Sequence, residues 1–171
     1  MSFLAFIKFE RNKKMSLEKV REYFEKYGMS DRIIEFSESS ATVRDAAKAA
    51  GCSEGEIAKS LSFMVGETPI LIIAAGDVKI DNAKYRGEFS VKAKMLPFES
   101  VEKIIGHAVG GVCPFAVNDG VEVYLDESLK RFEMVYPACG SSNSAIKLTI
   151  PELEKTSGFK KWVDVCKMIE G

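Results

Sequence analysis

The chain has 171 residues, of which 46% are hydrophobic and 29% charged, so one domain with a sizeable core is expected. Its 24 Lys and Arg against 25 Asp and Glu give a net charge of −1, which excludes a polybasic nucleic-acid binder but allows a local basic patch. Apolar stretches such as residues 69–75 are far shorter than the roughly 20 residues of a membrane span, so no membrane partner is expected.

Cysteine and histidine limit the possible chemistry further. Cys52, Cys113, Cys139 and Cys166 lack the paired spacing of zinc ligands, so no metal or other cofactor is expected. Dispersed cysteines without a signal peptide favour a reducing, cytoplasmic environment. The single histidine, His107, excludes sites that need two.

The N-terminal residues 1–14 precede the first predicted helix. Residues 3–7 read Phe-Leu-Ala-Phe-Ile, an apolar run too short for a signal peptide. We expect residues 1–14 to be an extension outside the domain, which then spans 15–171. The alternative is an extra strand over residues 3–9.

Capping residues, turn residues and the spacing of apolar residues predict the elements that follow. In chain order, the first half should contain a helix over 16–28, a strand over 32–36, a helix over 43–50, a short helix over 53–59, a hairpin of strands over 60–65 and 70–75, a helical turn over 81–86 and a strand over 91–95. The 53–59 helix is expected because Ser53 and Glu56 have the spacing of a capping box.

The second half continues with short elements. In chain order, these are a helix over 101–105, strands over 115–117, 121–125, 134–136 and 146–150, a helix capped by Thr149 and Glu152, and a strand over 162–166. Many short strands mixed with short helices predict a single-domain α+β fold, with a curled mixed sheet or barrel and helices packed outside it.

Three segments have residues suited to chemistry. The glycine-rich residues 106–115 can present backbone N–H groups to an oxyanion, although a structural turn also explains their composition. Residues 138–144 are small and rich in hydroxyls, which suits either a polar substrate or an ordinary loop. Lys59 enters an apolar strand, where its amine must find acceptors or snorkel to water.

Together, these segments resemble a known family. Ala58–Phe63, Ala75–Asp77, Gly110–Phe115, Val123–Asp126 and Cys139–Ser141 are similar in order and spacing to motifs of the YbaK/EbsC family. This family includes the bacterial Cys-tRNA(Pro) deacylase and the editing domain inserted in bacterial prolyl-tRNA synthetases. The resemblance covers about residues 15–166 and implies a small mixed barrel that hydrolyses mischarged tRNA in trans.

The resemblance also assigns roles to residues. Lys59 corresponds to the essential lysine of the family and Ser60 to the hydroxyl residue after it. The loop with Gly110, Pro114 and Phe115 would lie against the aminoacyl carbonyl, and the loop with Gly140 and Ser141 would form a second substrate contact. Cys113 and Ala116 depart from the usual Ser and Gly. Ala145 replaces an acid of the Cys-specific members, so the amino acid removed stays open among Ala, Ser and others.

An aminoacyl-tRNA is an activated ester, so its hydrolysis needs a positioned water and donors for the oxyanion rather than a strong nucleophile. We expect the backbone N–H groups of Gly111, Val112 and Cys113 to be those donors. Lys59 should hold the reacting end of the substrate in the same cleft as both loops. Apolar pocket walls are expected from Phe36, Phe63, Val112 and Phe115, although core packing would explain each equally well.

The expected partners are an aminoacyl-tRNA and a prolyl-tRNA synthetase. The best local basic patch, which a solvated surface would also explain, contains Lys79, Lys84, Arg86, Lys92 and Lys94. Two rival functions stay open. One is a cysteine hydrolase or redox protein in which Cys113 uses His107 as its base. The other is a module that binds an acyl or nucleotide group without hydrolysing it.

Overall fold

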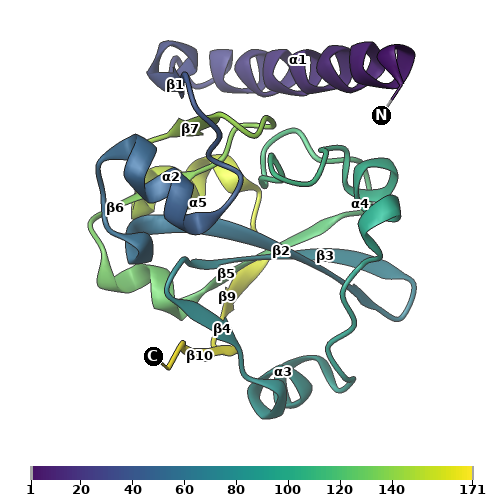
Figure 1. Cartoon of the computed structure of the whole chain (residues 1–171). Helices are drawn as coiled ribbons and strands as arrows, with labels where there is room; N and C mark the ends of the chain where they lie inside the picture. Colours follow the sequence, from purple (N-terminus) through teal and green to yellow (C-terminus); the bar gives the residue numbers. More distant parts are fainter. Residues whose placement is uncertain (1, 171) are drawn as a thin grey trace.

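A computed structural model describes residues 2–170, without the side chains of Phe9, Asn12 and Lys13 (Figure 1). Its strands are β1 (Ile33–Glu35), β2 (Ile57–Val65), β3 (Thr68–Ala75), β4 (Val78–Ile80), β5 (Glu122–Asp126), β6 (Met134–Pro137), β7 (Ser144–Ile146), β8 (Leu148–Thr149), β9 (Lys161–Val163) and β10 (Cys166–Met168). Its helices are α1 (Phe3–Glu25), α2 (Val43–Ala50), α3 (Asn82–Phe89), α4 (Phe98–Ile105) and α5 (Ile150–Ser157).

The centre of the fold is a mixed, curled six-stranded sheet in the order β8–β6–β2–β3–β5–β9. As predicted, β2 and β3 form an antiparallel hairpin, paired from Ala58 opposite Ala75 to Val65 opposite Thr68. β3 also pairs in parallel with β5, and its residues 70–75 are almost completely buried. This continuous apolar strand forms the core, and helices and two small strand pairs, β1–β7 and β4–β10, lie around it. The structure therefore confirms the predicted fold class.

Helix α1 lies across one end of the molecule, and α3 lies at the opposite end beside β4 and β10 (Figure 1). Val20 and Phe24 of α1 are fully buried, and the ring of Phe24 lies 4.5 Å from that of Phe115. The expected start of this helix at Ser16 is wrong, because α1 begins at Phe3 with Ser2 as its cap. The alternative of a strand over 3–9 is also wrong. Whether residues 1–14 lie outside the domain stays a prediction.

Tertiary pairing changes several other elements. Ser53 and Glu56 do form a capping box, but they open a single 3-10 turn, and the chain then enters β2 at Ile57 because residues 57 and 58 pair with β6. Residues 91–95 make one isolated bridge, Met95 to Phe63, instead of a strand. Residues 115–117 form no strand. The predicted strand over 146–150 is split into β7 and β8, and that over 162–166 into β9 and β10. None of the helices within residues 2–170 has the length and hydrophobicity of a membrane span.

Candidate functional site

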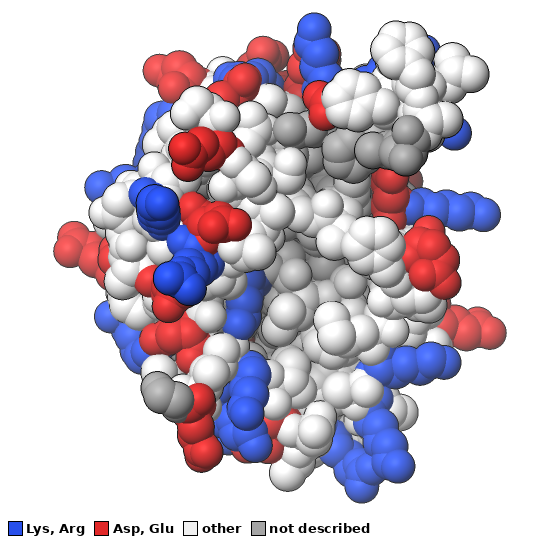
Figure 2. Space-filling model, in the orientation of Figure 1, with Lys and Arg blue, Asp and Glu red and all other residues white. Residues whose placement is uncertain are grey.

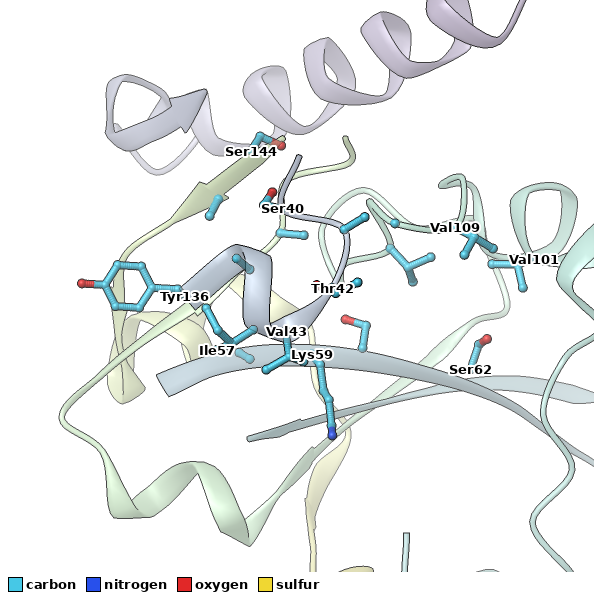
Figure 3. Close-up of a pocket in the computed structure, with 18 of the residues that line it drawn as sticks. Ser40, Thr42, Val43, Ile57, Lys59, Ser62, Val101, Val109, Tyr136 and Ser144 are labelled. Atoms are coloured by element: carbon cyan, nitrogen blue, oxygen red, sulfur yellow. The ribbon is translucent and has the colours of Figure 1, made fainter. Parts of the chain in front are cut away.

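A pocket of about 390 Å³ opens over one face of β2, between α2 and the glycine-rich loop (Figure 3). This volume is within the range of roughly 300–1,000 Å³ that is typical of small-molecule sites. The lining comes from five parts of the chain, within residues 40–46, 57–62, 95–101, 109–112 and 136–145. The fold thus joins segments that are far apart in sequence into one cavity.

Hydroxyl groups provide most of the polar character of this pocket, and no described lining residue is acidic. Several hydroxyls are already engaged: Thr42 Oγ1 caps α2 at 3.1 Å from Asp45 N, and Ser40 Oγ donates to Ser142 O at 3.2 Å. Ser60 is different, because its Oγ is buried and has no hydrogen-bond partner among the described residues. A buried hydroxyl without a partner costs free energy. Ser60 is therefore a lining residue whose hydroxyl still has an unused hydrogen-bonding capacity.

The two predicted loops meet at Gly111, as expected. A Cβ atom at this position would lie 2.5 Å from Gly140 C and Ser141 N, so only glycine allows this approach of two backbones. Gly110, at φ +98, lines the pocket, and so does Val112. From the second loop and its edge, the lining residues are Ala138, Ser144 and Ala145 rather than the predicted Gly140 and Ser141.

The predicted oxyanion donors differ in availability. The N–H of Gly111 donates to Ala108 O at 3.0 Å and is therefore already used. The N–H of Val112 has no acceptor among the described residues, and Val112 lines the pocket. Cys113 is completely buried and is not part of the lining. Val112 is thus the best donor of the predicted three.

Cys113 lies in a buried cluster with His107 and Ser16 of α1. His107 Nε2 lies 2.6 Å from Phe115 O and Nδ1 lies 2.7 Å from Ser16 Oγ. Because a carbonyl can only accept, Nε2 carries the proton and Nδ1 accepts from the Ser16 hydroxyl. Burial lowers the pKa of His107 to about 4 and raises the pKa of Cys113 to about 12. The Cys113 thiol stays protonated, and both ring nitrogens of His107 already have hydrogen-bond partners. Both observations argue against Cys113 as a nucleophile with His107 as its base.

Lys59 lies on β2 and is one of the residues that line the pocket, but its side chain points to the other face of the strand. Successive residues of a strand point to opposite faces, so Ser60 faces the pocket and the Lys59 side chain faces away from it. Figure 3 shows this amine on the far side of β2 from Thr42 and Val109. There, Nζ donates to Gly76 O at 3.3 Å and to Val78 O, and burial lowers the pKa of Lys59. Lys59 thus lines the pocket together with residues of both loops, as expected, but its amine is turned to the other face of β2. That it holds the reacting end of the substrate stays a prediction.

The aromatic pocket walls are also corrected. Phe63 is buried against Tyr85, with the ring centroids 5.2 Å apart, and Phe115 packs on Phe24. Pro114 is buried and Phe36 is half-buried, and neither lines the pocket. Core packing, the alternative that the sequence left open, accounts for Phe63 and Phe115.

The residues that sequence reasoning missed are mainly at the pocket entrance. They are Ser40, Thr42, Met95, Phe98 and Val109. The hydroxyl-rich run over residues 37–42, which directly precedes a helix cap, was a usable signal for the first two. Val109 belongs to the glycine-rich segment 106–115 that the sequence singled out, whereas Met95 and Phe98 come from segments that only the tertiary fold brings to the pocket.

The five predicted tRNA-binding cations are all exposed. Figure 2 shows Lys and Arg side chains gathered at the lower end of the molecule, where Figure 1 places α3 and the chain that follows it. Lys84 is engaged with Asp164 at 3.0 Å. Arg86 and Lys92 line a second, open groove, and no ion pair within residues 2–170 involves either of them.

Residues 37–156, which contain all the lining residues of the pocket, match the aminoacyl-tRNA editing domain family. The chain belongs to this family. Within it, the editing domain is similar to YwhH, an uncharacterized protein of Bacillus subtilis (strain 168), with 54% identity over 154 residues that cover 90% of this chain and 98% of YwhH. It is also 22% identical over 117 residues to a proline–tRNA ligase of Lactiplantibacillus plantarum, covering 68% of this chain and 20% of that enzyme.

Solved structures agree with this assignment. One, described as a candidate trans-editing enzyme for prolyl-tRNA synthetase, matches with a TM-score of 0.80 and 28% identity, covering 89% of this chain and 97% of the other. The hypothetical protein APE2540 matches with a TM-score of 0.77 and 25% identity, covering 87% and 99%. The editing domain and these proteins thus share a fold over nearly their whole lengths.

Proposed function

We propose that this chain is a trans-acting deacylase that hydrolyses the ester bond of mischarged tRNA of the tRNA(Pro) type. The observation that carries the proposal is the pocket of the editing domain, where the free N–H of Val112 and the unpartnered hydroxyl of Ser60 line one cavity. The trans-acting mode is supported by the match along nearly the whole of YwhH and of the candidate trans-editing enzyme.

The chemistry requires no protein nucleophile. Water attacks the ester carbonyl, and the Val112 N–H stabilises the oxyanion that forms, an effect worth about 3–4 kcal/mol for one well-placed donor. Ser60 Oγ holds the aminoacyl group in position. The 2′-hydroxyl of the substrate ribose accepts or relays the proton, so the lack of an acidic or histidine side chain in the described lining is no obstacle.

Lys59 lines the pocket, but its amine acts on the other face of β2. Its amine ties β2 to the backbone that follows β3 through Gly76 O and Val78 O, and thereby fixes the strand that carries Ser60. To hold the reacting end of the substrate directly, its side chain would have to leave these two carbonyls and cross to the other face of β2.

The size and polarity of the pocket favour a small, neutral aminoacyl group. Ala46, Ala58 and Ala145 line it. By the resemblance to the YbaK/EbsC family, Ala145 corresponds to the position of an acid in the Cys-specific members. Selection by size separates side chains that differ by one methylene by only about 1–3 kcal/mol, so alanyl and seryl esters are the expected substrates.

Recognition of the tRNA body is assigned to the exposed cations. Arg86 and Lys92 line the open groove, so phosphate contacts there would make binding salt-dependent. A prolyl-tRNA synthetase would add discrimination among tRNAs.

A deacylation panel tests the proposal. Cys-, Ala-, Ser-, Thr- and Pro-tRNA(Pro), with charged tRNA(Ala), tRNA(Ser) and tRNA(Thr), are incubated with the full chain, and ester loss is followed against the uncatalysed rate. Hydrolysis of a small-residue ester on tRNA(Pro) supports the proposal. Tight tRNA binding without hydrolysis would instead identify a binding module.

A further inference from the structure

Large apolar side chains surround the entrance of the pocket. Met95, Phe98 and Val109 all line it, yet 59%, 74% and 43% of their respective surfaces are exposed. Apolar groups gathered at the mouth of a cavity, in contact with water, are typical of a surface that a ligand covers. Met95, Phe98 and Val109 therefore form an apolar platform that is continuous with the cavity beneath it.

The backbone holds this platform rigidly beside β2. Met95 bridges Phe63 of β2, and Leu96 N donates to Ser62 O at 3.1 Å. Phe98 opens α4, and Val101, one turn later on the same helix face, is buried and lines the pocket. Phe98 thus belongs to the helix face turned to the cavity, although most of its ring is exposed.

The charges next to the platform indicate what covers it. Lys94 directly precedes Met95 and Lys92 lies two residues before Lys94, and both are exposed. Arg86 lies with Lys92 along the open groove next to α3. Aromatic and apolar faces beside free cations are the combination that binds single-stranded nucleic acid, because bases stack and phosphates pair with the cations.

We propose that Met95, Phe98 and Val109 form a stacking subsite for the terminal base of the substrate RNA. This inference rests on the proposed function. With its base on Phe98, the terminal nucleotide places its ribose at the pocket mouth and directs the ester toward Val112 and Ser60. The preceding phosphates then lie along Lys94 and Lys92.

The experiment uses two probes that cannot be hydrolysed. One is 3′-alanylamino-3′-deoxyadenosine, in which an amide replaces the ester. The other is the same compound with hydrogen in place of adenine. Alanine is chosen because a pocket that accepts a larger side chain also admits it. Binding of both probes is measured by calorimetry for the full-length parent and for Phe98→Ala, Phe98→Trp and Phe3→Ala, where Phe3 is a matched control with 77% exposure on α1, outside the pocket lining.

We expect Phe98→Ala to weaken binding of the adenine-containing probe by about 5-fold to 100-fold, the range measured for loss of one stacking partner. Binding of the base-free probe should stay unchanged. Phe98→Trp should retain the affinity, since a larger ring also stacks, and Phe3→Ala should match the parent.

Three results would overturn the subsite. They are an equal loss for both probes, equal binding of both probes by the parent, and no binding of either. If Phe98→Ala changes only self-association in sedimentation, the platform is a protein contact and the subsite is likewise rejected. The charged-tRNA panel separates the two proposals: a parent that hydrolyses no ester but shows the adenine-dependent pattern rejects the deacylase and retains the subsite.

Discussion

Replacement of Gly111 by alanine tests whether contact between the two loops determines activity. The new Cβ would lie 2.5 Å from backbone atoms of Gly140 and Ser141, whereas ordinary contact begins at 3.4 Å, so the loops must separate by about 1 Å. Val112 follows Gly111 directly and would move with it. A displacement of about 1 Å at a reacting group can cost on the order of 100-fold in rate.

The same substitution should also reduce stability. Forcing a methyl group into a close-packed contact costs roughly 1–3 kcal/mol. In a domain of this size, each kcal/mol lowers Tm by about 2–4 °C. The Tm of Gly111→Ala is therefore measured first by thermal unfolding. Its deacylation rate is then measured at a temperature well below that Tm.

Gly87→Ala is the matched control for stability. Gly87 lies inside α3, and a Cβ there meets nothing within 4 Å. Alanine in a helix should stabilise the protein by about 0.5–1 kcal/mol relative to glycine. A Gly111→Ala variant with the Tm and the rate of the parent would show that the loop contact is dispensable and would refute the reasoning.

Four further experiments test other parts of the molecule. Ser60→Ala should leave Tm unchanged or raise it, because the substitution removes a buried Oγ that has no partner, and it should lower kcat/KM at least about 10-fold; a loss of stability without a loss of rate would contradict its assigned role. Lys59→Met should reduce the free energy of unfolding by about 1–2 kcal/mol in chemical denaturation, since two carbonyls lose their donor, whereas an unchanged stability would indicate a free amine. The pKa of His107 is about 4 in the folded protein against 6.5 in the unfolded chain, so the unfolded state takes up a proton first as the pH falls. The contribution of His107 to the free energy of unfolding is therefore complete above pH 6.5, and about 3 kcal/mol of it is lost as the pH falls to 4. Urea titrations of His107→Gln should not show this loss. In filter binding, the double variant Arg86→Glu with Lys92→Glu should weaken tRNA binding and flatten its salt dependence. The control Lys84→Ala removes a cation that is already paired with Asp164, so it should change the salt slope less.

Local signals predicted the parts of the fold that local chemistry determines. Thr42 and Gly51 bound α2 as expected, and Thr149 with Glu152 forms the capping box of α5. At residues 53–56, the capping box was recognised correctly, but its helix ends after one turn because the strand partner of residues 57 and 58 is β6, which lies far along the chain. Pairing partners of this kind leave no trace in a short window of sequence.

The candidate site also combines features that the sequence predicted with features that depend on the tertiary fold. The convergence of the two glycine-containing loops was predicted, and so were the lining residues Ser60, Gly110 and Val112. The direction of Lys59 was not, although alternation along a strand that places Ser60 in the pocket requires its neighbour to face away. Met95 and Phe98 were missed because their position depends on how the chain returns to β2 after α3, which no local pattern encodes.

The seating of α1 has a consequence for how this pocket can evolve. Ser16 bonds to His107 in the first loop, its carbonyl faces Gly140 in the second, and Lys19 holds Gly106 O at 2.9 Å, yet none of these α1 residues lines the cavity. A change of packing along this helix would alter the spacing of both loops while every lining side chain stays the same. Selectivity for the amino acid can therefore drift through substitutions that a comparison of pocket residues alone would never reveal.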